Sequence, residues 1–142
     1  MTGTIARADA LAELSLFVGC SRKELHAVER LGTFVHVVAG RTLCREGEIG
    51  RECFIVLSGA ASVIRGGRQI ATIGAGEPIG EVAVLNPELR RTATVVAGTP
   101  MDLLVLGRRE LVELLHRAPS IGLRLIRIVT SRVHAAPRMG PR

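Results

Sequence analysis

The chain has 142 residues, which is the usual length of one domain and enough for a hydrophobic core that needs no disulfide or metal. Hydrophobic residues make up 47% of the sequence but aromatic residues only 2%, so the core must consist mainly of aliphatic side chains. The scarcity of aromatic residues also argues against recognition of single-stranded nucleic acids by base stacking. A net charge of +6 leaves nucleic acids, anionic membranes and acidic proteins as partner classes to weigh.

The positive charge is mostly arginine and is spread along the chain rather than gathered into one block. Its only concentration lies in the last third and consists of Arg117, Arg124, Arg127, Arg132, Arg138 and Arg142. This distribution favours a solvated helix face followed by a loose tail over a surface that follows a phosphate backbone. We therefore predict no DNA-binding element.

The three cysteines, Cys20, Cys44 and Cys53, are scattered and show no Cys-x-x-Cys spacing. They are predicted to be buried thiols in a reducing compartment rather than disulfides or zinc ligands. The sequence shows neither a signal peptide nor an apolar run long enough to span a membrane. Together these features predict a cytoplasmic protein with no membrane partner.

The first 32 residues are predicted to form an N-terminal helical hairpin. The segment Asp9 to Phe17 is short and apolar on one side. Ser21 and Glu24 have the spacing of a capping box, which predicts a second helix that reaches about Leu31.

Residues 33–106 consist of short Val-, Ile- and Leu-rich runs separated by glycines. Turn signals every eight to twelve residues or so are typical of an antiparallel sandwich or barrel. The adjacent glycines Gly66 and Gly67 predict a tight hairpin turn. We interpret the region as a double-sheet jelly-roll β-barrel in a mainly β fold with flanking helices. Its clearest strands are 33–38, 53–58, 61–65, 69–73, 92–97 and 102–106.

Two helices are predicted after the barrel, within residues 107–134. The first covers Arg108 to Arg117, and the second begins at Pro119, a residue favoured at the first position of a helix, and reaches about Val133. Proline and glycine near the C-terminus predict a flexible tail over residues 137–142. Residues 1–136 are therefore expected to form one domain.

The segment from Ile79 to Val95 contains the clearest chemical motif. Gly80 and Glu81 open a short apolar helical turn, whose free backbone N–H groups can bind a phosphate. Arg91 supplies a guanidinium with paired donors, and the hydroxyl of Thr92 adds another donor. Glu81 remains as an acceptor for a sugar hydroxyl. Singly, these residues could equally be an ion pair, a turn glycine and an ordinary strand.

At these residues the chain resembles the cyclic-nucleotide-binding domains of protein kinase A regulatory subunits, cyclic-nucleotide-gated channels and catabolite activator proteins. Upstream runs such as residues 39–43, 45–48 and 54–59 resemble the opening strands of the same family. The residues that match the family's phosphate-binding cassette in order are Gly80, Glu81, Ala83, Arg91, Thr92, Ala93, Thr94 and Val95.

The resemblance implies cAMP, or less favourably cGMP, as the ligand, with no further cofactor. Arg91 would bind the phosphate, and the backbone N–H of Ala83 and the Thr92 hydroxyl would complete its cradle. Glu81 would accept the ribose 2′-hydroxyl, and Gly80 would let the backbone approach the sugar. The predicted ligand-binding residues are Gly80, Glu81, Val82, Ala83, Arg91, Thr92 and Ala93.

The cassette departs from the family pattern in three places. Ile79 replaces the usual Phe, Pro78 stiffens its approach, and the loop before Arg91 is one residue longer than the commonest spacing, although it matches the catabolite activator type. Arg90 thereby competes with Arg91 for the phosphate role, and we assign Arg90 to solvent. The last helix offers no aromatic residue to cap the purine, so the predicted lid is aliphatic, drawn from Leu125, Ile128 and Val129.

The resemblance implies a stand-alone sensor, because no output module follows the barrel in this sequence. It would act on an unknown protein effector, or on a second copy, by repositioning its C-terminal helices. The alternative is a degenerate domain that has lost its ligand and serves as an interaction or dimerisation module. Enzyme activity is not expected, since the four histidines include no His-x-His pair and no nucleophile–base arrangement is visible.

Overall fold

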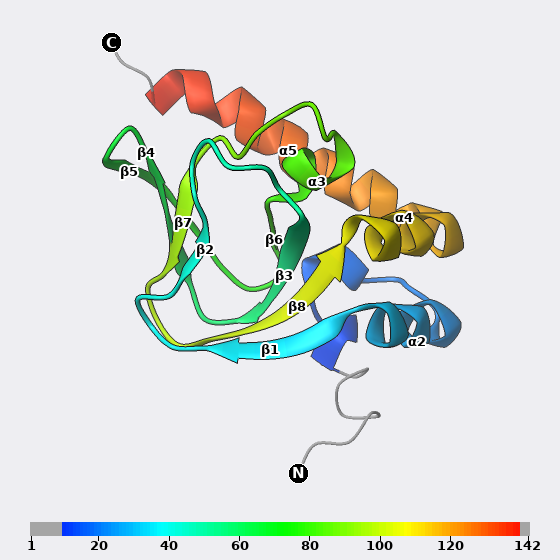
Figure 1. The fold of residues 1–142 in the computed structure, drawn as a ribbon. Coiled ribbons are helices and arrows are strands. Elements are labelled where there is room, and N and C mark those ends of the chain that lie inside the picture. The colour runs from blue at the N-terminus through cyan, green and yellow to red at the C-terminus, as the bar shows by residue number, and fades with distance from the viewer. Residues whose placement is uncertain (1–9, 140–142) are drawn as a thin grey trace.

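The computed structural model describes the backbone of residues 10–139 and the side chains of residues 10–132. Two four-stranded sheets face each other, and the helices lie along one side and across one end of them (Figure 1). The elements in chain order are η1 (Ser15–Phe17), α2 (Arg22–Leu31), β1 (Thr33–Val37), β2 (Thr42–Cys44), β3 (Glu52–Ser58), β4 (Ala61–Arg65), β5 (Arg68–Ile73), β6 (Pro78–Ile79), α3 (Glu81–Leu85), β7 (Thr94–Ala97), β8 (Met101–Gly107), α4 (Arg108–Arg117) and α5 (Pro119–Met139).

The sheets have the strand orders β1-β8-β3-β6 and β2-β7-β4-β5, and every pairing between named strands is antiparallel. This arrangement confirms the predicted double-sheet jelly roll with flanking helices. The hairpin between β4 and β5 turns through Gly66 and Gly67, which have φ values of +59° and +79°. Both angles lie in the left-handed region that glycine adopts without steric cost, as the turn prediction requires.

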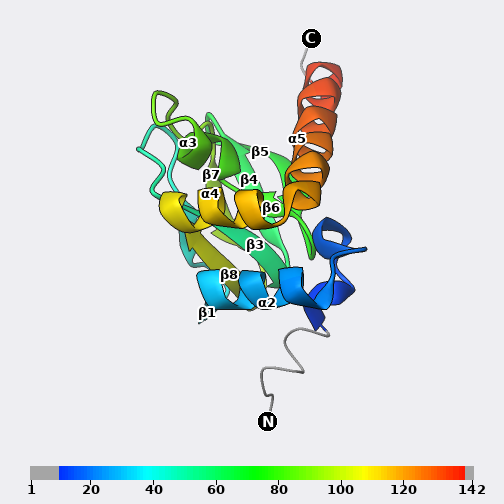
Figure 2. The ribbon, with the colours of Figure 1, turned by 90° about the vertical axis from the view of Figure 1, so that its right-hand side faces the viewer.

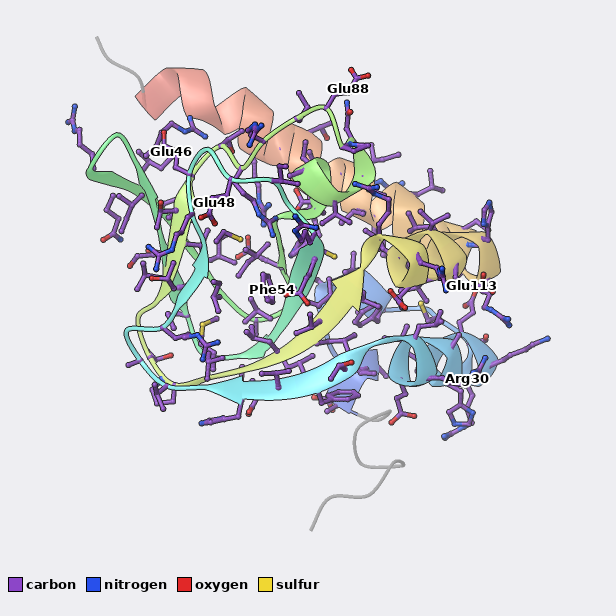
Figure 3. The ribbon with its side chains drawn as sticks, in the orientation of Figure 1. Arg30, Glu46, Glu48, Phe54, Glu88 and Glu113 are labelled. Atoms are coloured by element: carbon purple, nitrogen blue, oxygen red, sulfur yellow. The ribbon has the colours of Figure 1, made fainter. Side chains whose placement is uncertain are left out.

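The central strands β3 and β8 are covered on both faces over most of their length. Phe54 and Val56 of β3 point between the two sheets, as Figure 3 shows for Phe54, whereas Cys53 and Ile55 belong to a second core formed with the helices. Because successive side chains of a strand point to opposite faces, a strand covered on both sides reads as a continuous apolar run. The two cores are almost entirely aliphatic, as the composition predicts.

The capping box is present at the start of α2. The Glu24 backbone N–H donates to Ser21 Oγ over 3.1 Å, and the Ser21 N–H donates to Glu24 Oε1 over 2.8 Å. The other arm of the expected hairpin is only partly helical: residues 10–12 are helical, extended backbone at Leu14 follows, and η1 completes the arm. A segment this short cannot stabilise an α-helix by itself, and the break lets Phe17 be buried. Asp9 lies outside the described residues.

Three strand predictions need correction. β7 begins at Thr94 rather than at residue 92, so Thr92 and Ala93 lie in the preceding loop. β2 was indicated only by the resemblance of residues 39–43 to the family's opening strands, and β6 was not predicted as a strand. They have three and two residues, too few for an alternating pattern to be recognised.

Both C-terminal helices form, and α4 has the predicted bounds. α5 starts at Pro119 as predicted but continues to Met139, so residues 137–139 belong to the helix and not to a tail. Pro137 lies in the last turn, where its missing N–H removes one backbone hydrogen bond without ending the helix. Residues 140–142 of the predicted tail lie outside the described part.

Figure 2 shows the far half of α5 extending past the sheets. Within residues 10–139, no helix has the length and apolar character needed to cross a membrane.

Candidate ligand-binding site

A cavity of about 400 Å³ opens between β4, the β6–α3 segment, the loop before β7 and one side of α5. Its volume lies within the range of small-molecule sites. All the residues predicted to bind ligand line it, although they come from two segments: Gly80, Glu81, Val82, Ala83, Arg91, Thr92 and Ala93. The structure thus brings the whole predicted set together around one space.

Gly80 precedes α3 with φ +78°, a left-handed conformation that favours glycine. A Cβ at this position would overlap Nη1 of Arg91 and would lie 3.4 Å from the Cys44 sulfur. Beside the expected close approach of the sugar, the structure thus gives a second reason for glycine at this position. Gly80 leaves room for the Arg91 guanidinium itself.

Arg91 is half-buried and is held on both its backbone and its side chain. Its N–H donates to Glu48 O and its carbonyl accepts from Gly47 N, each over 2.8 Å. Its Nη1 donates to Gly80 O over 2.9 Å and its Nη2 to Glu52 O over 2.7 Å. A guanidinium carries five N–H donors, so three remain for an anion in the cavity.

Gly50 completes the support of Arg91. A Cβ on Gly50 would lie 2.6 Å from Ala83 Cβ and 3.1 Å from the Arg91 guanidinium carbon. A larger residue would therefore push apart Ala83 and Arg91, which line the same cavity. The sequence motif does not include Gly50, because it lies 30 residues upstream of Gly80 in the chain.

Glu81 is the one buried charged residue among those described, with 4% of its surface exposed. Its Oε2 lies 3.5 Å from Arg132 Nη1, and no ion pair with Arg91 is formed among the described residues. Its Oε1 is buried without a hydrogen-bond partner in the described part of the chain. Burial raises the pKa of this carboxyl, and the charge of Arg132 opposes that rise. A buried acceptor with no partner is costly, so a ligand hydroxyl placed there would recover a hydrogen bond.

Arg132 reaches this site from α5, which the sequence analysis did not foresee. Its Nη2 donates to the carbonyl of Pro78 over 2.6 Å and lies 3.5 Å from a carboxylate oxygen of Glu77. The solvated-face interpretation is therefore wrong for Arg132, and also for Arg124, whose Nη1 donates to Leu16 O over 3.4 Å. More than 50 residues separate Arg132 from its partners, so no local pattern could have indicated the contact.

Of the predicted lid residues, only Val129 lines the cavity. Leu125 is 5% exposed and packs with Ile121 in the core between the helices and the sheet, and Ile128 packs against the same core. Residues 121, 125, 128 and 132 lie within about 60° of one another around the helix, and residue 129 is only about 40° from residue 125. The division therefore runs along α5: Leu125 and Ile128 still pack on the core, whereas Val129 and Arg132, each one turn further on, reach the cavity. The lid prediction is wrong for Leu125 and Ile128.

Two more arginines line the cavity. Arg65, at the end of β4, donates through Nε to Thr92 O over 3.0 Å, and the sequence analysis did not identify it. Arg90 is exposed, as predicted, and its Nη1 donates to Gly47 O over 3.4 Å. Burial raises the pKa of the Cys44 thiol to about 11, so this wall stays neutral despite the nearby Arg91. Four guanidinium groups and one carboxylate thus make the cavity strongly basic.

Comparisons with known proteins identify the family of this fold. The family model described as the cyclic nucleotide-binding domain matches residues 34–118, which include nearly all of the barrel, α3 and α4. The chain belongs to the cyclic nucleotide-binding domain family.

Its relatives are larger proteins of several kinds. The human cyclic nucleotide-gated channel beta-1 is 34% identical over 115 residues, which are 77% of this chain and 9% of the channel. The Thermus thermophilus catabolite activator protein superposes with a TM-score of 0.75 at 28% identity, covering 86% of this chain and 59% of that one. A cAMP-binding acyltransferase from Mycobacterium smegmatis gives a TM-score of 0.76 at 31% identity, covering 91% and 41%. The chain therefore spans a small part of the channel and about half of the other two.

Within this cyclic nucleotide-binding domain, the unusual residues before Gly80 have packing roles. Ile79 is 1% exposed and pairs with Phe54 across β6 and β3. Pro78 is buried, and its carbonyl accepts the hydrogen bond from Arg132. The aliphatic residue thus fills the inter-sheet core, and the proline presents an acceptor to α5. The family match ends at residue 118, so Val129 and Arg132 lie beyond it.

Proposed function

We propose that this domain binds a 3′,5′-cyclic nucleotide in the cavity between Arg91 and Glu81, with cAMP preferred and cGMP the alternative. The observation that supports this most directly is that two residues line the same cavity: Glu81, whose Oε1 is buried without a partner among the described residues, and Arg91, which has spare donors. A cyclic nucleotide carries one phosphate charge and one free ribose hydroxyl, which match these two groups. The Mycobacterium smegmatis relative is described as cAMP-binding, which supports the preference for cAMP.

The phosphate, the ribose and the base of the ligand would each meet chemically complementary groups in the cavity. The spare N–H groups of Arg91 bind the phosphate oxygens, and the exposed hydroxyl of Thr92 adds a donor at the same edge. Glu81 accepts the 2′-hydroxyl. Apolar side chains such as Val63 and Val129 line the rest of the cavity and can bury the base. These walls offer few hydrogen bonds to a purine edge, so discrimination between adenine and guanine is small.

We further propose that the domain binds its ligand without catalysing a reaction. Among the described residues, no group of three or more His, Cys, Asp and Glu side chains is placed to hold a metal ion. Ser58, Asp102 and His36 form a chain of hydrogen bonds, but both Ser58 Oγ and His36 Nδ1 bond to Asp102. The imidazole is therefore not placed to activate the serine hydroxyl.

The proposed output is a change in α5, read by a protein effector or by a second copy of the domain. α5 exposes Leu123 and Ile126, with 61% and 59% of their surfaces accessible. This apolar pair also favours the second candidate function, an interaction module that binds no nucleotide.

Calorimetric titration of the nucleotide-stripped protein with cAMP and then cGMP tests the proposal. Arg91→Ala removes the phosphate donors and should weaken binding about a hundredfold or more, since truncating one partner of a buried charged hydrogen bond costs about 2–5 kcal/mol. Arg90→Ala is the matched control, because its guanidinium is exposed, and it should weaken binding by less than about fivefold. Circular dichroism would verify that both variants are folded. No heat with either nucleotide for the unmodified protein would leave the interaction module as the function.

A further inference from the structure

Arg132 is the residue through which α5 contacts the cassette. Its guanidinium reaches three groups in five consecutive residues: the Glu77 carboxylate, the Pro78 carbonyl and the Glu81 carboxylate. The shortest contact, 2.6 Å to the Pro78 carbonyl, sets the position of the guanidinium. Arg132 is one-third exposed, whereas the Glu81 side chain is 5% exposed. The arginine therefore covers the outer side of a buried carboxylate.

The two oxygens of Glu81 have different surroundings. Oε2 faces Arg132 at 3.5 Å, and Oε1 is buried with no partner among the described residues. Orienting one oxygen of a carboxylate determines where the other lies. A nearby cation also favours the ionised form, which accepts hydrogen bonds and competes for no donor of its own. The contact thus opposes the rise in pKa that burial causes, and by orienting Oε2 it fixes the direction of the free oxygen.

We propose that Arg132 is a positioning residue that gives the domain its selectivity for nucleotides with a free ribose 2′-hydroxyl. It does not bind the nucleotide; it acts by holding Oε2 of Glu81 so that Oε1 accepts the hydroxyl. The inference rests on the proposed function and deepens it, because it names the ligand group that the α5 contact serves. It also links ligand binding to α5, because the ligand and Arg132 of α5 both contact the carboxylate of Glu81.

A purely structural role for Arg132 predicts a different result. If Arg132 only fastened α5 to the barrel, its loss would lower the affinity for every cyclic nucleotide by the same factor. If Arg132 competed with the hydroxyl for Glu81, its loss would strengthen binding of the ribose form. The positioning role predicts that only the affinity for the nucleotide with a 2′-hydroxyl falls. The ratio of the affinities for the ribose and deoxyribose forms therefore separates the three cases.

The test measures affinities for cAMP and for 2′-deoxy-cAMP by calorimetry in the unmodified protein and in Arg132→Met. We expect the unmodified protein to prefer cAMP by about tenfold to a hundredfold, the usual effect of a hydrogen bond to a charged group. In Arg132→Met the ratio should fall to within about threefold of unity, with the affinity for the deoxy form unchanged within about threefold. Arg127→Met, which removes an exposed charge from the same helix, should keep the original ratio.

Two further variants guard against misfolding and indirect effects. Arg132→Lys keeps a cation opposite Glu81 and should give an intermediate ratio. In a Glu81→Gln background, Arg132→Met should change neither affinity further, because the two residues act as a unit. An unchanged ratio in Arg132→Met, or equal loss for both nucleotides, would overturn the inference. Failure of the unmodified protein to bind either nucleotide would instead overturn the proposed function, and this inference with it.

Discussion

Replacing Gly80 by alanine tests how tightly the site is built around Arg91. The substitution forces a left-handed φ of +78° on a residue with a Cβ, at a cost of about 1–2 kcal/mol. The new Cβ also displaces the guanidinium from its bonds to Gly80 O and Glu52 O. Because Arg91 is half-buried and can recover bonds to water, losing these bonds costs about 1 kcal/mol each. The total destabilisation is about 3–4 kcal/mol.

Gly67→Ala is the matched control for Gly80→Ala. Gly67 has φ +79°, and a Cβ there would meet nothing within 4 Å. The control therefore carries the backbone cost alone, about 1–2 kcal/mol. For a domain of this size, each kcal/mol of destabilisation lowers Tm by about 3 °C. The Tm measured by thermal unfolding should therefore fall by about 10 °C for Gly80→Ala and by about 5 °C for the control.

Nucleotide titration on the same samples completes this experiment. Gly80→Ala should lower the cAMP affinity about tenfold or more, because the guanidinium no longer lies where its spare donors face the cavity. Gly67 lies outside the cavity, so the control should bind like the unmodified protein. Equal Tm losses for the two variants, together with unchanged cAMP affinity in Gly80→Ala, would refute the conclusion that Gly80 makes room for Arg91.

Two further predictions concern ionisable groups in the ligand-free protein. Burial raises the folded-state pKa of Glu81 above its ordinary value of 4.5, so between these two values the folded chain binds more protons than the unfolded chain, and stability falls as pH rises. Thermal unfolding from about pH 4 to about pH 8 should therefore show Glu81→Gln gaining stability relative to the unmodified protein, and the opposite trend would contradict this sign. Burial also raises the thiol pKa to about 11 for Cys44 and about 12 for Cys53. Brief alkylation at about pH 8 followed by mass spectrometry should modify the half-exposed Cys20 first, and rapid labelling of Cys44 would show that the cavity wall is open.

The bounds of elements that end at a glycine or proline could be predicted from the sequence almost to the residue. β4 ends just before the Gly66–Gly67 turn, and α4 is bounded by Gly107 and Pro119, so their limits depend on residues within a few positions. β2 and β6 have no such signal, because their backbone hydrogen bonds are made to strands distant in the sequence. Tertiary pairing alone makes them strands.

The same distinction applies to the site. The predicted residues from Gly80 to Ala93 come from one contiguous motif, and folding brings its two ends to one cavity. The lid could not be chosen from the sequence because α5 is apolar on several faces, and the pattern does not show which turns of the helix pack on the core and which pass the cavity. Val129 and Leu125 differ by one turn in sequence, yet only Val129 lines the site.

Each of the two charged residues of the motif is held in part by segments outside the motif. Arg91 takes its direction from the Glu52 carbonyl and from the space left by Gly50, whereas Glu81 takes its direction from Arg132 on α5. The proposed phosphate and ribose halves of the site therefore receive support from different elements, the first from the barrel and the second from α5. A chain with the same motif but no arginine on this face of its last helix should retain phosphate binding while losing discrimination for the ribose hydroxyl. On the proposed function, the motif alone indicates an anion site, and the supporting residues determine which nucleotide it selects.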